Sequence, residues 1–164
     1  KSEGVTELIL DLRDNSGGSV KAAEEIADYF LDEGVIYQMI PKNGNSVTIE
    51  SDSTYDPIPM VVVVNDGTAS AAELLSGALK DRGRAILVGD TTFGKGIMQN
   101  PFRFPDGVLT LTFAEYATPN GTRIHKKGVT PNQVVSLPEE DRYRWPTLTL
   151  DQDPQLLAAI KAMV

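Results

Sequence analysis

The sequence predicts an α/β protein with mostly parallel strands, an attached antiparallel hairpin and a C-terminal helix. Short apolar runs typical of buried strands, above all MVVVV at 60–64, alternate along the chain with stretches of helical periodicity. An Asn-Gly pair at 43–44 lies between two further strand-like segments and is a strong hairpin signal. Asp153 and Pro154 open the last helical stretch, and proline is well suited to a first helical turn.

These patterns place the elements in a definite order, with turns rich in glycine, proline and asparagine between them. The expected elements are a strand at 7–13, a helix at 20–31, strands at 35–40 and 46–50, a strand at 60–64, a helix at 69–82, strands at 85–89, 97–104 and 108–116, and a helix at 153–164. Strands that alternate with helices favour a parallel sheet.

The first two helices are expected to bury one apolar face each, because their apolar residues recur at helical spacing. These residues are Ala23, Ile26, Ala27 and Phe30 in the first helix and Leu74, Leu75, Ala78 and Leu79 in the second. The strand at 108–116 instead alternates apolar residues with threonines, which is typical of a half-buried strand. Its apolar positions are Leu109, Leu111 and Phe113.

Ser70 is the first candidate functional residue. It lies in the motif NDGTASAAE at 65–73, where a buried strand ends and a helix begins. Backbone N–H groups at a helix start lack partners within the helix and carry partial positive charge. A serine hydroxyl in that place can attack a carbonyl while a neighbouring N–H holds the oxyanion. The alternative is that Ser70 only caps the helix, as serine often does.

Lys95 is the second candidate, in the glycine-flanked loop of TTFGKGIMQ at 91–99. A lysine acts as general base only when it is neutral, so its amine must be shielded from water. Glycines allow the chain to bring such a side chain against packed surface. Gln99 follows four residues later and is able to orient the amine without adding a charge. The alternative is an ordinary solvent-exposed loop lysine.

A third candidate lies at the end of the first strand, in the motif LRDNSGG at 12–18. Gly17 and Gly18 allow backbone N–H groups to point into a cavity, as an oxyanion site requires. A Gly-Gly pair is also common in plain tight turns. The glycine pair with its N–H donors, the serine and the lysine each follow a strand. Together they are stronger evidence for a catalytic site than any one of them alone.

These three motifs, with ATPNGTRI at 117–124 and KGVTPN at 127–132, resemble the carboxyl-terminal processing proteases, also called tail-specific proteases. The resemblance runs from about Leu8 to the end of the chain. It implies a serine peptidase with a serine–lysine pair, on a fold related to the Clp protease and crotonase proteins. By position, the nucleophile is Ser70, the general base is Lys95 and its orienting partner is Gln99; the oxyanion hole is formed by Ala71 and Gly18, with Gly17 as a further donor.

The resemblance also carries expectations about the whole protein. It implies that residues 1–164 form a single domain, an incomplete C-terminal part of the catalytic core without the PDZ domain that binds substrate tails. The beginning at 1–4 is expected to lie within a helix-to-strand connection. The parent is expected to act outside the cytoplasm, in the periplasm, at the cell surface or as a secreted protein, on C-terminal tails of proteins or peptides. Homo-oligomers and membrane attachment through an N-terminal segment are compatible with the family. Full activity of this chain alone stays open.

Composition excludes several classes of function. With 164 residues, 41% of them apolar, the chain has the size of one domain with its own core. The net charge of −8 argues against nucleic acid, because phosphate binding needs clustered Lys and Arg. The absence of cysteine excludes disulfides and cysteine-based zinc sites. No apolar stretch approaches the roughly 20 residues that span a membrane.

No metal or cofactor is expected. Four carboxylates at strand ends lack the spacing of zinc or calcium ligands, and turn or cap roles explain each of them. These residues are Asp11, Asp14, Asp66 and Asp90. His125 is the only histidine, so a serine–histidine–aspartate triad would have to recruit it from a Gly- and Lys-rich turn. We expect it to be a plain surface histidine.

Two other classes of function remain open from the residues alone. A crotonase-like acyl-CoA enzyme would share the oxyanion corners but would not need a nucleophilic Ser70. A non-catalytic binding or assembly module is compatible with a chain that holds only part of a catalytic core.

Overall fold

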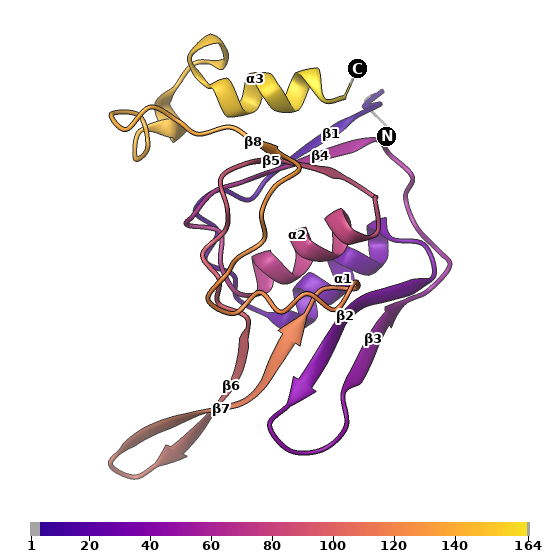
Figure 1. The fold of residues 1–164 in the computed structure, drawn as a ribbon, viewed down its shortest axis with the longest axis vertical. Helices are drawn as coiled ribbons and strands as arrows, with labels where there is room; N and C mark the ends of the chain where they lie inside the picture. The colour runs from indigo at the N-terminus through magenta and orange to yellow at the C-terminus, as the bar shows by residue number, and fades with distance from the viewer. Residues whose placement is uncertain (1–3, 164) are drawn as a thin grey trace.

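Two four-stranded sheets enclose two helices in the computed structural model, which describes residues 4–163 (Figure 1). Residues 1–3 of the expected helix-to-strand connection at 1–4, and residue 164 of the predicted final helix, lie outside the described part. One sheet is wholly parallel, in the order β1 (Leu8–Asp11), β4 (Met60–Val64), β5 (Ile86–Gly89) and β8 (Gln133–Val134). The other is wholly antiparallel, in the order β3 (Val47–Ser51), β2 (Gly34–Pro41), β7 (Gly107–Ala117) and β6 (Ile97–Phe104).

The helices α1 (Val20–Phe30) and α2 (Ala71–Asp81) lie between the two sheets, and α3 (Pro154–Lys161) covers the outer face of the parallel sheet (Figure 1). Strand β4 is therefore buried on both faces, with Val62 and Val64 in the main core and Val61 and Val63 in the smaller core under α3. This explains its unbroken apolar run, which is typical of a central parallel strand. Helix α2 is buried along residues 71–79 because it packs in the middle of the molecule.

The predicted α/β class and the predicted elements are confirmed, with ends that differ by one to a few residues. Helix α2 buries its predicted apolar residues, whereas Ile26 of α1 is 42% exposed because it lies at the edge of a surface cavity. The sequence did not predict β8, the short 3₁₀ turns Trp145–Thr147 and Leu150–Gln152, or a second sheet that joins the two hairpins.

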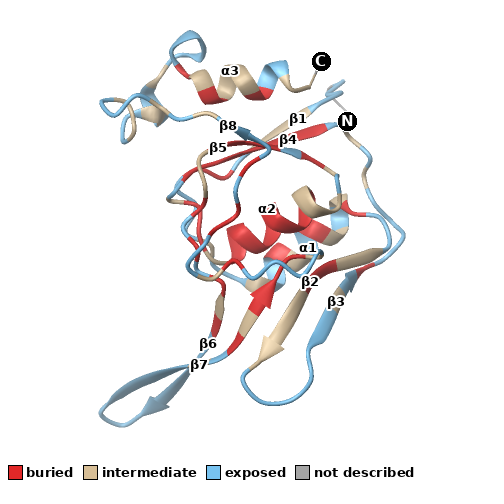
Figure 2. Ribbon diagram, in the orientation of Figure 1, coloured by how far each residue is buried: buried red, intermediate tan, exposed pale blue. Residues whose placement is uncertain are grey.

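The prediction that 108–116 is half buried is wrong for its first part. Leu109 and Leu111 are 48% and 47% exposed, because the β6–β7 hairpin projects beyond the body of the molecule (Figure 2). Only the end of β7, at Ala114, Tyr116 and Ala117, enters the core. An alternating pattern marks an amphipathic strand, but it does not say whether anything covers the apolar face.

Helix α3 is fixed to the parallel sheet by a buried ion pair. The Arg13 guanidinium donates to Asp153 Oδ2 at 2.7 Å and to Asp11 Oδ2 at 2.6 Å. Asp153 also caps α3, since its Oδ1 accepts from the N–H of Leu156 at 3.0 Å. The Trp145 ring lies 4.0 Å from the same guanidinium. Within the described residues, no helix has both the length and the apolar character needed to cross a membrane.

Replacing Asp153 tests this attachment. Asp153→Ala removes both a partner of the buried Arg13 and the cap of α3. We expect the free energy of unfolding to fall by about 3 kcal/mol, the low end for a broken buried pair, because Asp11 still neutralises Arg13. Urea denaturation measures the change. The exposed Asp151→Ala is the matched control, with an expected change within about 0.5 kcal/mol; equal losses in the two variants would contradict the assignment.

Candidate active site

Ser70 lies on a strained turn between β4 and α2. Its φ of +57° and ψ of −122° are rare for any residue other than glycine. The buried Thr68 holds the turn in place: its hydroxyl donates to the carbonyl oxygen of Leu12 at 2.8 Å and accepts from the N–H of Asn65 at 3.0 Å. Strain of this kind persists only where surrounding contacts fix the backbone, and it clusters at functional sites.

The carboxylate of Glu73 is the main contact that fixes this backbone. Glu73 is fully buried, and its Oε2 accepts from the N–H of Ser70 at 2.9 Å and from the N–H of Lys95 at 2.8 Å. Its Oε1 accepts from the N–H of Gly94 at 2.7 Å and from the hydroxyl of Thr92 at 2.5 Å. One buried carboxylate thus joins the serine turn to the lysine loop.

Tyr116 makes a second connection between the same two residues. Its hydroxyl lies 2.6 Å from the carbonyl oxygen of Ser70 and 2.8 Å from that of Lys95. Burial, and then the negative charge of Glu73, raise the pKa of Tyr116 above its ordinary value, so the phenol stays protonated and can donate. The backbone of Ser70 and that of Lys95 are therefore linked through their N–H groups by Glu73 and through their carbonyls by Tyr116.

Sequence reasoning missed both Glu73 and Tyr116. For Glu73 a local signal exists, since it is three residues after Ser70, in the position of a capping-box glutamate. For Tyr116 there is no local signal, because its contact with Ser70 spans 46 positions of sequence.

Ser70, Lys95 and Gln99 line one cavity of about 420 Å³, together with Gly18. The expectation that the Lys95 side chain is sheltered from water is wrong for this structure, because Lys95 is exposed. Its backbone is held in place, but the amine extends into an open cavity. Within residues 4–163, no hydrogen bond joins the Ser70 hydroxyl to the Lys95 amine. Gln99 instead donates to the Thr112 hydroxyl at 3.3 Å.

The glycine beside Lys95 is required by close packing. Gly94 has a φ of +90°, and a Cβ there would lie 2.9 Å from the backbone nitrogen of Lys127. The Lys95 loop is therefore pressed against the turn that carries His125. His125 itself is half buried and is not among the residues that line the cavity of Ser70.

The corner at Gly17 and Gly18 packs directly against the serine turn. A Cβ on Gly17 would lie 2.6 Å from the carbonyl oxygen of Ala69 and 2.8 Å from the nitrogen of Ala71. The N–H of Gly17 is already engaged by Asn15 Oδ1 at 2.9 Å, so it is not free to hold an oxyanion in this conformation. Within the described part of the chain, the N–H groups of Gly18 and Ala71 have no acceptor. Both residues line an adjoining, largely apolar cavity of about 380 Å³.

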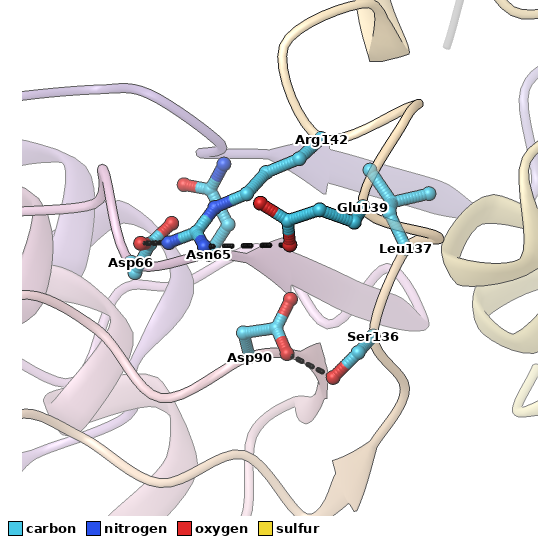
Figure 3. A pocket seen from close by; sticks show the side chains of 7 residues that line it. All are labelled: Asn65, Asp66, Asp90, Ser136, Leu137, Glu139 and Arg142. Atoms are coloured by element: carbon cyan, nitrogen blue, oxygen red, sulfur yellow. Dashed lines mark hydrogen bonds and ion pairs between the residues drawn. The ribbon is translucent and has the colours of Figure 1, made fainter.

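A further pocket, at the carboxyl ends of β4 and β5, differs from the cavity of Ser70 and Lys95 because its polar groups satisfy one another (Figure 3). Arg142 pairs with Asp66 and, at 3.9 Å, with Glu139, and Ser136 donates to Asp90. The remaining strand-end carboxylates are also paired, Asp11 with Arg13 and Asp14 with Asn65 and Trp145. The described residues contain no cluster of three or more metal-ligating side chains.

Comparison with known proteins identifies relatives of this chain. The sequence pattern of peptidase family S41 matches residues 1–135. A carboxyl-terminal-processing protease of Synechocystis sp. is 41% identical over 163 residues, which make up 98% of this chain and 37% of that protein. The chloroplastic carboxyl-terminal-processing peptidase 2 of Arabidopsis thaliana is 43% identical over 147 residues, 86% of this chain and 28% of the relative. The solved structure of a photosystem II D1 C-terminal processing protease matches with a TM-score of 0.75 at 39% identity, covering 84% of this chain and 37% of that one.

The chain belongs to peptidase family S41. The resemblance inferred from the motifs at 12–18, 65–73 and 91–99 is thereby confirmed, and it sets the chain among peptidases rather than acyl-CoA enzymes. The S41 match includes the serine turn, the lysine loop and both hairpins, and it ends before α3. The chain spans roughly a third of the length of the S41 relatives described above.

Removing the Tyr116 hydroxyl tests the connection between the two loops. Tyr116→Phe is expected to speed amide hydrogen exchange at Ser70 and Lys95 by about fivefold, because one internal hydrogen bond stabilises by about 1 kcal/mol. Hydrogen-exchange mass spectrometry of peptides that cover 70–73 and 94–96 measures it. Tyr37→Phe is the matched control: Tyr37 is equally buried and packs against Tyr116, but its hydroxyl donates to Glu24. The same acceleration in both variants would show that the Tyr116 hydroxyl does not fix the site.

Proposed function

We propose that this chain carries the catalytic residues of a serine endopeptidase that cleaves proteins near their C-terminal tails through an acyl-enzyme. The observation that supports this most is the single cavity lined by Ser70, Lys95 and Gln99, with Gly18 at its border with a second, apolar cavity. Nucleophile, base and oxyanion donor come from three separate strand ends and meet at one cavity, and acyl transfer requires such groups to lie close together.

In the proposed mechanism, the neutral Lys95 amine removes the proton of the Ser70 hydroxyl. The Ser70 oxygen then attacks the peptide carbonyl, and the N–H groups of Ala71 and Gly18 stabilise the negative oxygen of the tetrahedral intermediate. Lys95 returns the proton to the departing amine as the peptide C–N bond breaks. The same lysine then deprotonates a water molecule, whose oxygen attacks the acyl carbonyl. The ester C–O bond to Ser70 breaks, and Lys95 returns the proton to the Ser70 oxygen.

The exposure of Lys95 gives the substrate a part in this mechanism. An amine in contact with water is stabilised in its charged form, and that form cannot accept a proton. A peptide that fills the cavity excludes water from the Lys95 side chain, which favours the neutral amine where the base is needed. Substrate binding and activation of the base are therefore coupled in this proposal.

For the intact protein, we propose protein or peptide C-terminal tails as substrates and a site of action outside the cytoplasm. The names of the relatives, which are carboxyl-terminal-processing proteases, support the first point. The second point rests on the resemblance to this family. The intact protein could also form oligomers or be attached to a membrane through a further segment. Neither property is required by the proposed mechanism.

Removal of the two reacting groups tests the proposal. In the intact protein, Ser70→Ala and Lys95→Ala are each expected to lower kcat for peptide cleavage by about 10⁴-fold or more, because residues that act as one unit fail together. The measurement is steady-state cleavage of a fluorogenic peptide, with circular dichroism to verify the fold. Lys127→Ala, an exposed lysine beside the same loop, is the control and should retain full activity. Near-normal turnover in Lys95→Ala would exclude this lysine as the base.

The role of Gln99 is tested separately. If Gln99 orients the Lys95 amine when substrate is bound, Gln99→Ala lowers kcat by less than the roughly 10²–10⁴-fold contribution of a general base. Thr112→Val removes the present partner of Gln99 and should leave kcat unchanged. Kinetics with the same peptide as above measure both variants. An unchanged kcat in Gln99→Ala would show that Gln99 does not orient the Lys95 amine and only takes part in the structure of the hairpin.

A further inference from the structure

The β6–β7 hairpin is exposed along most of its length (Figure 2), and one of its two faces carries large apolar side chains. Phe102 pairs with Leu109, so the two side chains share one face of the hairpin. Alternate positions along each strand extend this face in both directions. We call it the hairpin face; its members are Phe102, Phe104, Leu109, Leu111 and Phe113, which are 49%, 58%, 48%, 47% and 37% exposed.

The opposite face of the same hairpin is different in character. It carries Arg103, Thr110 and Thr112, and Val108 is its large apolar residue, 58% exposed. The hairpin is therefore amphipathic although it projects into solvent. Contiguous exposed apolar side chains of this kind mark binding surfaces, whereas single ones are ordinary.

The hairpin face continues into the cavity of Ser70 and Lys95. A groove of about 430 Å³ lies between the hairpin and the end of β2, lined on one side by Pro41, Lys42 and Asn43 and on the other by residues of β6 and β7. Two of those hairpin residues, Asn100 and Phe113, also line the cavity of Ser70. Phe102 and Leu111 lie farther along the groove. One path therefore leads from the proposed nucleophile onto the hairpin face.

We propose that the hairpin face binds apolar side chains of the substrate, several residues away from the peptide bond that is cut. This inference rests on the proposed function and adds a specificity site to it. The occupant is an extended peptide segment, because a chain that reaches Ser70 through this cavity meets Asn100 and Phe113 at the entrance of the groove. Side chains at alternate positions of an extended peptide are about 7 Å apart, the same spacing as Phe113, Leu111 and Leu109 along β7. The matching substrate has apolar residues at alternate positions over about five residues.

The test uses the intact protein and two peptide substrates. Both contain the same cleavage sequence, and one continues into a segment with alternating leucines where the other has serines. The double variant Phe104→Ser/Leu109→Ser removes two members of the hairpin face that line neither the groove entrance nor the cavity of Ser70. Val108→Ser on the opposite face is the matched control, with the same exposure as Phe104.

The wild type is expected to show a KM about tenfold lower for the leucine peptide than for the serine peptide, with similar kcat. The double variant should lose this difference, and Val108→Ser should keep it. Equal KM values for the two peptides in the wild type would overturn the inference while leaving the proposed function intact.

Two further results would also overturn it. If the double variant keeps the KM difference but dissociates into smaller species in sedimentation, a second copy of the chain covers the face. If the double variant keeps the KM difference but unfolds at a lower temperature than the wild type, another segment of the same polypeptide covers the hairpin face. Failure of the wild type to cleave either peptide would instead reject the proposed function, and this inference with it.

Discussion

The buried carboxylate of Glu73 is the interaction on which the candidate site depends. A fully buried charge is stable only when hydrogen bonds replace the water it loses. Glu73 receives four, from the backbone of Ser70, Gly94 and Lys95 and from the Thr92 hydroxyl. Because bonds to an ionised acceptor are stronger than neutral ones, displacing either loop would leave part of this charge uncompensated. The two loops therefore hold their relative position.

This arrangement separates what is fixed from what is free. The backbone of Ser70, strained at positive φ, is fixed by Glu73, Tyr116 and Thr68. The backbone of Lys95 is fixed by the first two of these, whereas its side chain is exposed. With both backbones fixed, the Lys95 amine and the Ser70 hydroxyl can approach each other only by rotation of their side chains in the cavity. A candidate site of this kind can hold its two side chains apart while the backbone of both loops stays ordered.

The sequence predicted the features that depend on residues close together in the chain. It did not predict the features that depend on contacts between distant segments. The serine turn, the Lys95 loop and the glycine corner each follow a strand with a run of apolar residues, so a local pattern reveals them. Tyr116 and the second sheet depend on pairings between distant segments, which no local pattern contains. The exposed Leu109 and Leu111 illustrate the same limit: alternation correctly indicated an amphipathic strand, but it did not show that the described chain leaves the apolar face uncovered. Strand β8, only Gln133–Val134, is too short to give a periodic signal.

The most direct test of this account is covalent labelling of the intact protein with a phosphonofluoridate, with the modified residue located by mass spectrometry. The account predicts one phosphonyl group on Ser70, and labelling at least tenfold slower in Glu73→Gln, whose amide nitrogen would face N–H donors. The exposed Glu25→Gln should label like the wild type. A label on another residue, or equal rates in wild type and Glu73→Gln with the fold retained, would contradict the claim that Glu73 holds a reactive serine in place.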